Sequence, residues 1–322
     1  MRDGPLVSVV TPTLNQAQFI GATLRSVRAQ TYPLIEHIVV DGGSTDGTVA
    51  ILERESEAAA GRLQWQSGRD RGMYDAINKG LALAKGDLLA FLASDDVWMP
   101  WAVEAVVREF EAKPDLDLVF GDGIKVYTED GAQRLRLFAP FDRVSLANYE
   151  SLMQPAVFWR RQVTDRIGGF DANMRYVADL DYWLRAAADG ATIAHLDEVV
   201  AIERIHDARL SIAQRDAMAA EDREMRAKHF GELAGAEGRE RAKRRHIRWQ
   251  RLLWLRFLAA ANLRSVPGPW HRFLHEGKAK VRTRRALAVA LRPSYRNPRN
   301  AVISKLAADI LAGTALGPAA TQ

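Results

Sequence analysis

The 322-residue sequence contains no cysteine, so it can form no disulfide and offers no thiolate to a metal. This composition suits a reducing compartment. The chain also lacks a run of about 18 apolar residues, and we therefore expect no transmembrane helix. Its N-terminal stretch has neither the apolar span nor the small-residue cleavage site of a signal peptide. These absences favour a cytoplasmic protein.

Two common phosphate-binding loops are missing as well. After the first apolar run the chain reads TPTLNQAQFIG, which is neither the G-x-G-x-x-G fingerprint of dinucleotide-binding proteins nor a P-loop. This argues against hydride transfer and against P-loop phosphoryl transfer. Hydrophobic residues make up 48% and charged residues 26% of the chain, as in a globular protein with a substantial core.

Charge is distributed unevenly along the chain. Residues 1–238 hold 26 Lys and Arg against 37 Asp and Glu, a net charge of −11. Residues 239–305 hold 19 basic and 2 acidic residues, a net charge of +17. We therefore predict two regions, a catalytic domain over residues 1–230 and a basic, largely helical region over 231–322.

The first half of the chain alternates between two hydrophobic periods. Short apolar runs at 6–10 and 88–92 are typical of buried strands, 36–40 and 63–66 read as further strands, and the segments between the strands have helical spacing. Further on we expect a helix over 100–110, a strand at 118–120 and a hairpin over 125–137. The alternation predicts an α/β fold with a mostly parallel sheet flanked by helices, followed by a basic helical C-terminal extension.

Polar residues follow three of these predicted strands, namely Thr11, Asp41 and the adjacent pair Asp95 and Asp96. The carboxyl ends of parallel strands meet at one edge of a sheet, where ligands bind. A lone aspartate there is usually a turn residue. Asp95 and Asp96, however, lie too many residues before the helix expected at Pro100 to cap its N-terminus. Two adjacent carboxylates predict a site for Mn²⁺ or Mg²⁺.

Four segments together carry a family resemblance. The chain reads VSVVTPTLN, HIVVDGGSTDGT, DRGMYDAINKGLALAKGDLLAFLASDD and ADLDYWLR, in that order. Over about residues 6–210 it resembles the family 2 glycosyltransferases, which have the GT-A fold. The resemblance implies metal-dependent, inverting transfer of a sugar from a nucleotide-sugar. Uridine is the default base, with guanosine and deoxythymidine open.

The resemblance also implies roles for individual residues. Thr11 and Asp41 resemble the positions that hold the base and ribose of the nucleotide. Asp70 and Arg71 resemble a further nucleotide contact, although without the resemblance a surface turn before a helix is the better explanation. Asp95 belongs to the acidic metal-binding motif and also faces the donor.

Asp96 resembles the direct metal ligand of that motif, with Asp95 beside it. His206 stands where such enzymes often carry a histidine near the metal or the diphosphate. Without the resemblance, a lone histidine after a strand is more often merely solvated.

Asp179 resembles the base that accepts the proton of the acceptor hydroxyl. The family often has glutamate before it, and here Ala178 takes that place. Asp181 and Gln154 resemble acceptor-side residues. A purely structural explanation is also available for each residue. The two aspartates would be acids that stabilise a helix N-terminus, and Gln154 would be a buried, hydrogen-bonded glutamine.

Residues 239–262 read as a basic amphipathic helix in which Trp and Leu alternate with Arg. Such a helix can bind an anionic membrane surface, bind nucleic acid, or pack on the catalytic domain. We expect the membrane surface, because enzymes of this kind commonly act on polyprenyl-diphosphate-linked acceptors. The protein would then be cytoplasmic, peripheral on the inner face of the membrane.

The sequence prediction is thus a glycosyltransferase that acts on a lipid-linked or glycan acceptor in surface polysaccharide synthesis. Three alternatives remain open. A nucleotidyltransferase would make a nucleotide-sugar rather than consume it. A nucleic-acid-binding protein would act through the basic region, but it leaves the strand-end aspartates unexplained. A non-catalytic nucleotide-sugar binder would bind the donor without turning it over.

Overall fold

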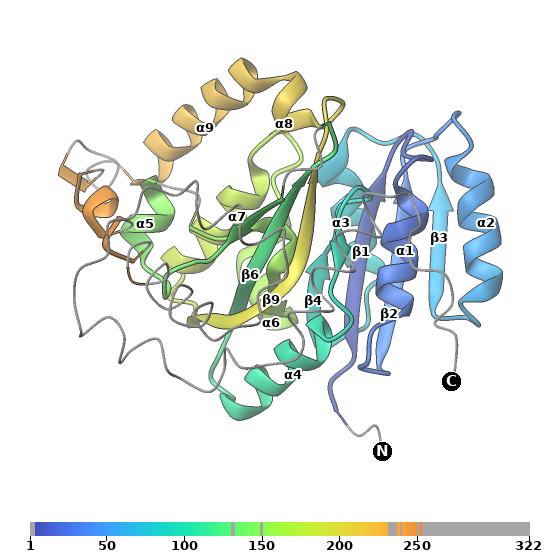
Figure 1. Ribbon diagram of the computed structural model, residues 1–322, viewed down its shortest axis with the longest axis horizontal. Helices are drawn as coiled ribbons and strands as arrows, with labels where there is room; N and C mark the ends of the chain where they lie inside the picture. Colours follow the sequence, from blue (N-terminus) through green and yellow to red (C-terminus); the bar gives the residue numbers. More distant parts are fainter. Residues whose placement is uncertain are drawn as a thin grey trace, which may run out of the picture.

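The computed structural model describes residues 4–129, 133–148 and 151–230, together with 237, 238, 240–245, 247–249 and 252. Figure 1 shows β3 and α2 at one end of the molecule and α5 and α9 toward the other. Residues 253–262 of the predicted basic helix lie outside the described residues. The division at residue 230 stays a prediction.

The first half of the chain alternates strand and helix as expected. Its elements are β1 (Val7–Thr13), α1 (Ile20–Arg28), β2 (Ile35–Asp41), α2 (Thr48–Ala58), β3 (Leu63–Ser67), α3 (Met73–Leu83) and β4 (Leu88–Phe91). The strands pair in parallel in the order β3-β2-β1-β4. Val39 packs with α1 and α2, whereas Val40 belongs to the cluster that contains Ile77 of α3. Both faces of this part of the sheet are therefore covered, and β1 and β4 are buried throughout, whereas the edge strand β3 is largely exposed.

The second half extends the sheet with mixed pairing. Its elements are β5 (Val97–Trp98), α4 (Ala102–Ala112), β6 (Leu118–Tyr127), β7 (Gln133–Arg136), α5 (Arg143–Asn148), the 3₁₀ helix η1 (Gln154–Ala156), β8 (Val157–Arg160), α6 (Arg161–Ile167), α7 (Ala178–Ala188), β9 (Ile193–Ile205), α8 (Leu210–Ala213) and α9 (Arg215–Phe230). β8 is antiparallel to β4 and to β6, while β9 is parallel to β6. The predicted α/β fold is confirmed, with a sheet that is parallel across its first four strands and mixed beyond them.

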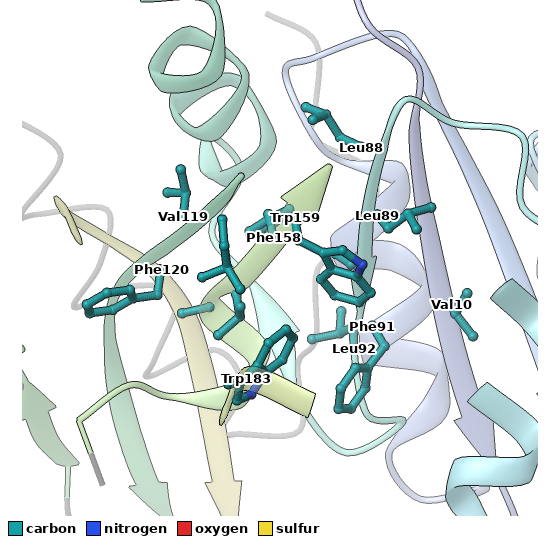
Figure 2. Packing of buried hydrophobic residues seen from close by; sticks show 14 of the residues in the cluster. Val10, Leu88, Leu89, Phe91, Leu92, Val119, Phe120, Phe158, Trp159 and Trp183 are labelled. Carbon is teal, nitrogen blue, oxygen red and sulfur yellow. The ribbon is translucent and has the colours of Figure 1, made fainter. Parts of the chain in front are cut away.

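An aromatic cluster joins the two halves of the sheet (Figure 2). Trp159 of β8 lies 5.3 Å from Trp183 of α7 between ring centroids, and Phe170 stacks on Tyr182 at 4.4 Å. Aromatic pairs in such geometries contribute about 0.5–1.5 kcal/mol beyond the area they bury. They fix α7 against the sheet, and with it the first turn of α7.

The first strand extends beyond its predicted end. The sequence places Thr11 after the strand, because Pro12 normally interrupts a ladder, but β1 continues to Thr13. The carbonyl oxygen of Val10 accepts a hydrogen bond from the Leu92 N–H, so the backbone polar groups of Val10 face β4. The direction of these groups alternates from residue to residue along a strand, and the backbone nitrogen of Pro12 therefore faces β4 as well. β4 has already ended at Phe91, so the missing N–H of Pro12 breaks no pairing.

No helix in the part of the chain that the structure describes is long and apolar enough to cross a membrane.

Candidate active site

The buried carboxylate of Asp41 organises the loop that follows β2. It accepts hydrogen bonds from the backbone N–H groups of Gly43 at 3.1 Å and Ser44 at 3.0 Å, and from Ser67 Oγ at 2.6 Å. Ser44 Oγ donates to it as well. Asp41 therefore shapes the loop at the sheet edge through its own hydrogen bonds.

Asp70 lies against this loop. A Cβ atom added to Gly42 would sit 2.9 Å from Asp70 Oδ2, so a larger residue at position 42 would displace the carboxylate from this place. Asp70 Oδ1 also accepts a bond from the Gly72 N–H at 2.9 Å. The neighbouring Arg71 pairs with Asp75 at 2.9 Å, and its side chain is 73% exposed. The structure thus brings Asp70 to the end of β2 and leaves Arg71 on the surface above α3.

Thr11 is not at the edge. It is buried inside β1, and its hydroxyl lies 2.8 Å from His37 Nε2. Burial lowers the pKa of His37 to about 3, so this imidazole is neutral. Two residues further on, Thr13 pairs with Asp41 across the strands, and its buried hydroxyl has no hydrogen-bond partner. Thr13 therefore occupies the strand-end position that the sequence assigns to Thr11.

Asp95 and Asp96 lie in the turn between β4 and β5, and both are buried. Asp96 Oδ1 accepts the backbone N–H of Arg204 at 3.0 Å, while Asp96 Oδ2 is buried with no partner. Asp95 Oδ2 lies 3.1 Å from His206 Nε2, whose ring stacks on Phe19. The structure therefore brings Asp95, Asp96 and His206 together, and their role as metal ligands stays a prediction.

Burial and charge act in opposite directions on this pair. Burial raises the pKa of Asp96, and the negative charge of Asp95 adds to the rise. Burial also acts to raise the pKa of Asp95, but the hydrogen bond from His206 and the charge of Arg209 outweigh it, so that pKa is lowered. Arg209, which follows β9, sits against both carboxylates. Its guanidinium is the positive charge of the cluster.

The residues present fit a divalent cation. Mg²⁺ and similar ions are commonly held by one or two carboxylates and complete their shell with water and substrate phosphates. Asp96 Oδ2 and His206 Nδ1 are buried polar atoms without partners, so ligand atoms are open. Among the described residues no three His, Cys, Asp or Glu side chains gather as a ready ligand set. A cation held by Asp96 with Asp95 and His206 beside it would complete its shell with water or with oxygens of a bound ligand.

Asp179 lies in the first turn of α7 with Tyr74 of α3 against it. The Tyr74 hydroxyl is 3.2 Å from Asp179 Oδ1 and 3.0 Å from the carbonyl oxygen of Tyr176, and the Leu180 N–H donates to Asp179 Oδ1 at 2.8 Å. Burial raises the pKa of Asp179 to about 6 in spite of these bonds. A carboxyl group with this pKa can accept a proton near neutral pH.

The start of α7 is held by α9. Glu221 accepts the backbone N–H groups of Arg175 at 2.9 Å, Tyr176 at 2.8 Å and Val177 at 3.0 Å. Since these residues immediately precede α7, the bonds fix the direction in which the helix starts. The orientation of Asp179 is thus set from both α3 and α9.

The structure places Gln154 against the end of β4 and turns Asp181 toward α9. Gln154 Nε2 donates to the carbonyl oxygen of Phe91, the last residue of β4, at 2.8 Å. Asp181 is buried between Arg185 at 2.7 Å and His229 at 2.5 Å. Its contacts tie α7 to the end of α9, and its acceptor role stays a prediction.

Sequence reasoning missed Tyr74, Arg209 and Thr13. Tyr74 and Arg209 stand in the stretches RGMYDAINKG and IHDARLS, beside residues that were singled out. Their contacts span 105 and 113 residues. Thr13 could have been found by extending β1 through Pro12.

Comparisons with known proteins agree on one family. Residues 8–179 match the description "Glycosyl transferase family 2". An uncharacterized glycosyltransferase of Mycobacterium tuberculosis is 40% identical over 190 residues, covering 58% of this chain and 71% of the relative. A "PGL/p-HBAD biosynthesis glycosyltransferase" of the same organism is 35% identical over 198 residues, covering 61% and 75%.

The fold of this chain resembles those of solved structures. TarS of S. aureus (residues 1–349) in complex with UDP-GlcNAc has a TM-score of 0.54 at 17% identity, with 93% of this chain and 75% of that chain covered. The mannosyltransferase PcManGT from Pyrobaculum calidifontis, in complex with GDP-Man and Mn²⁺, has a TM-score of 0.53 at 20% identity, with 97% and 86% covered. A longer TarS chain is spanned to only 44% of its length. At these identities the likeness concerns the fold.

Proposed function

Because the chain belongs to glycosyltransferase family 2, we propose that it moves a sugar from a nucleotide-sugar to an acceptor hydroxyl with inversion, with a divalent cation at Asp95 and Asp96. One observation carries this proposal. Asp95, Asp96 and His206 form one buried cluster after β4, in which Asp96 Oδ2 and His206 Nδ1 have no hydrogen-bond partner. Two buried polar atoms beside two carboxylates are thus open to a cation and its phosphate ligand.

Each group then has a role. Asp41 and Asp70 shape the edge of the sheet where the nucleotide-sugar would bind, and the Thr13 hydroxyl would be a further contact to the nucleotide-sugar. Asp96, with Asp95 and His206 beside it, would hold the cation. That cation, Mn²⁺ or Mg²⁺, supplies charge neutralisation to the departing nucleoside diphosphate.

Asp179 would accept the proton of the acceptor hydroxyl as its oxygen attacks the anomeric carbon. The bond from that carbon to the diphosphate oxygen breaks on the opposite side of the sugar. Tyr74 acts through Asp179 as a positioning residue.

Sugar transfer from a panel of UDP-, GDP- and dTDP-sugars to a bacterial lipid extract tests the proposal. We expect one nucleotide class to give a labelled product and the free nucleoside diphosphate. Release of pyrophosphate from a nucleoside triphosphate would instead identify a nucleotidyltransferase. Donor binding without turnover would identify a non-catalytic binder.

For the acceptor we propose a lipid-linked or glycan molecule of the cell surface. The relative named for PGL/p-HBAD biosynthesis supports a glycolipid class. The described part of the basic region supports a membrane contact. Residues 240–245 and 247–249 are helical, and Ala242 is buried. The basic side chains Arg241, Lys243, Arg244 and Arg248 of this segment are exposed.

Vesicle flotation tests that membrane contact. The protein is expected to float with vesicles containing anionic lipid, and to lose binding as salt is raised, because the attraction is electrostatic. Changing Arg241, Lys243, Arg244 and Arg248 to Gln should weaken flotation, whereas Lys85→Gln, an exposed lysine outside this region, should not. Equal flotation with neutral vesicles would count against the contact, and salt-sensitive binding to nucleic acid alone would favour the rival function.

The pH dependence of transfer should show the titration of Asp179. Because the base must be deprotonated, kcat/KM is expected to fall as the pH drops through about 6. In Tyr74→Phe the Asp179 carboxylate loses a hydrogen-bond donor that stabilises its charged form. The acidic limb of the pH profile, where kcat/KM falls, should therefore move to higher pH. Initial rates between pH 5 and 8 measure both limbs. An unmoved limb with unchanged rates in Tyr74→Phe would remove Tyr74 from the mechanism.

A further inference from the structure

Arg209 lies at the centre of three carboxylates. Its Nη1 is 3.1 Å from Asp96 Oδ1 and 3.5 Å from Asp95 Oδ2, and its Nη2 is 2.7 Å from Glu203 Oε1. The side chain is only 15% exposed. A guanidinium in this position offsets the mutual repulsion of three partly or fully buried negative charges.

The other nearby basic groups have different contacts. Arg204 donates through its guanidinium to the backbone oxygens of Asp95 and Phe19, and it stacks over the Phe19 ring at 5.0 Å. Lys125 Nζ lies 3.2 Å from Glu203 Oε2, on the far oxygen from Arg209. Among the described lysines and arginines, Arg209 is the one whose side chain pairs with both carboxylates of the aspartate pair, and His206 also lies 3.1 Å from Asp95 Oδ2.

The carboxylates that hold Arg209 are those that would hold the divalent cation. Two positive groups within a few ångströms of each other repel strongly at a site removed from water. We propose that Arg209 is an internal counter-cation that competes with the divalent metal for Asp95 and Asp96. This inference rests on the metal site of the proposed function.

One consequence concerns the order of binding. Metal alone must either displace the guanidinium or bind beside it at the open Asp96 Oδ2. A nucleoside diphosphate adds negative oxygens that compensate both positive groups. Arg209 therefore makes metal binding weak in the free enzyme and couples it to the arrival of the diphosphate.

Mn²⁺ binding without nucleotide, measured by electron paramagnetic resonance of the free ion, tests the competition. Arg209→Gln is expected to bind Mn²⁺ about tenfold or more tightly than the wild type, since one repulsive charge is removed. The Mn²⁺ affinity of Arg209→Lys should lie between those of the wild type and Arg209→Gln, because the point charge of lysine pairs with one carboxylate at a time. Lys125→Gln is the control, because it also removes one positive charge, but from a side chain that pairs with Glu203 and not with the aspartate pair. The Mn²⁺ affinity of this variant should stay within about twofold of that of the wild type.

Thermal unfolding gives a second readout that involves no catalysis. Without metal, Arg209→Gln should unfold at a lower temperature than the wild type, because the carboxylates lose their counter-charge. Mn²⁺ should raise its unfolding temperature by more than that of the wild type, as ligand linkage requires.

The outcomes separate this inference from the function it rests on. If the wild type binds Mn²⁺ and Arg209→Gln binds it no more tightly, the competition is refuted and the metal site stands. If neither protein binds Mn²⁺, even with UDP or GDP, the metal site and the competition both fall. Should Arg209→Gln not fold, Arg209→Lys decides, and an unchanged or weaker Mn²⁺ affinity in that variant refutes the inference.

Discussion

Asp179→Asn is expected to lower sugar transfer by about 10²–10⁴-fold, the usual contribution of a general base. Asparagine has nearly the same shape and keeps an oxygen to accept the Leu180 N–H, but it cannot take a proton from the acceptor. Because the proposed nucleotide-sugar contacts lie on other elements, the dissociation constant of the nucleotide should change by less than about threefold. Transfer rates and calorimetric nucleotide binding, measured on one preparation, give both quantities.

A control from the same helix separates this effect from a general loss of charge. Asp189 follows the last turn of α7 and pairs with Arg166 at 2.7 Å on the surface. Asp189→Asn should transfer sugar at the wild-type rate. Loss of nucleotide binding in Asp179→Asn would make Asp179 a donor ligand, and full activity in that variant would end its assignment as the base.

Asp96→Asn is expected to weaken metal-dependent nucleotide binding by about tenfold or more. The change removes the negative charge of the candidate ligand and puts an amide at the open oxygen position, which weakens Mn²⁺ binding by about tenfold or more. The fold should persist, because burial already disfavours the charged form of this side chain and raises its pKa. Mn²⁺ titration with and without UDP or GDP measures the loss, and circular dichroism checks the fold.

The matched control is another buried aspartate away from the site. Asp122 pairs with His195 at 2.8 Å and accepts the Phe138 N–H at 2.8 Å. Asp122→Asn should leave Mn²⁺ affinity unchanged even where it lowers stability. Wild-type Mn²⁺ affinity in Asp96→Asn would move the metal away from this pair.

The fold was predictable where local pattern decides it. Alternating apolar runs and helical spacing predict the parallel half of the sheet, because strands buried on both faces read as continuous apolar runs. The edge where Asp41 and Asp96 lie follows from strand direction alone. The extent of β1 did not follow, because whether Pro12 breaks a ladder depends on where β4 ends.

Side-chain directions and distant partners limited the prediction of the site. Asp179 and Asp181 are two residues apart, about 200° around a helix, so they point to different surroundings. Only the tertiary structure shows that Asp181 faces His229, or that Tyr74 and Arg209 reach carboxylates more than a hundred residues away. Periodicity carries no information on such contacts.

Calorimetric binding of UDP, GDP and dTDP to the wild-type protein, with and without Mn²⁺, tests the central claim most directly. The account predicts that one of these nucleotides binds, and that Mn²⁺ tightens its binding. If none of the three binds under either condition, the claim that this sheet edge is a metal-dependent nucleotide-sugar site is contradicted.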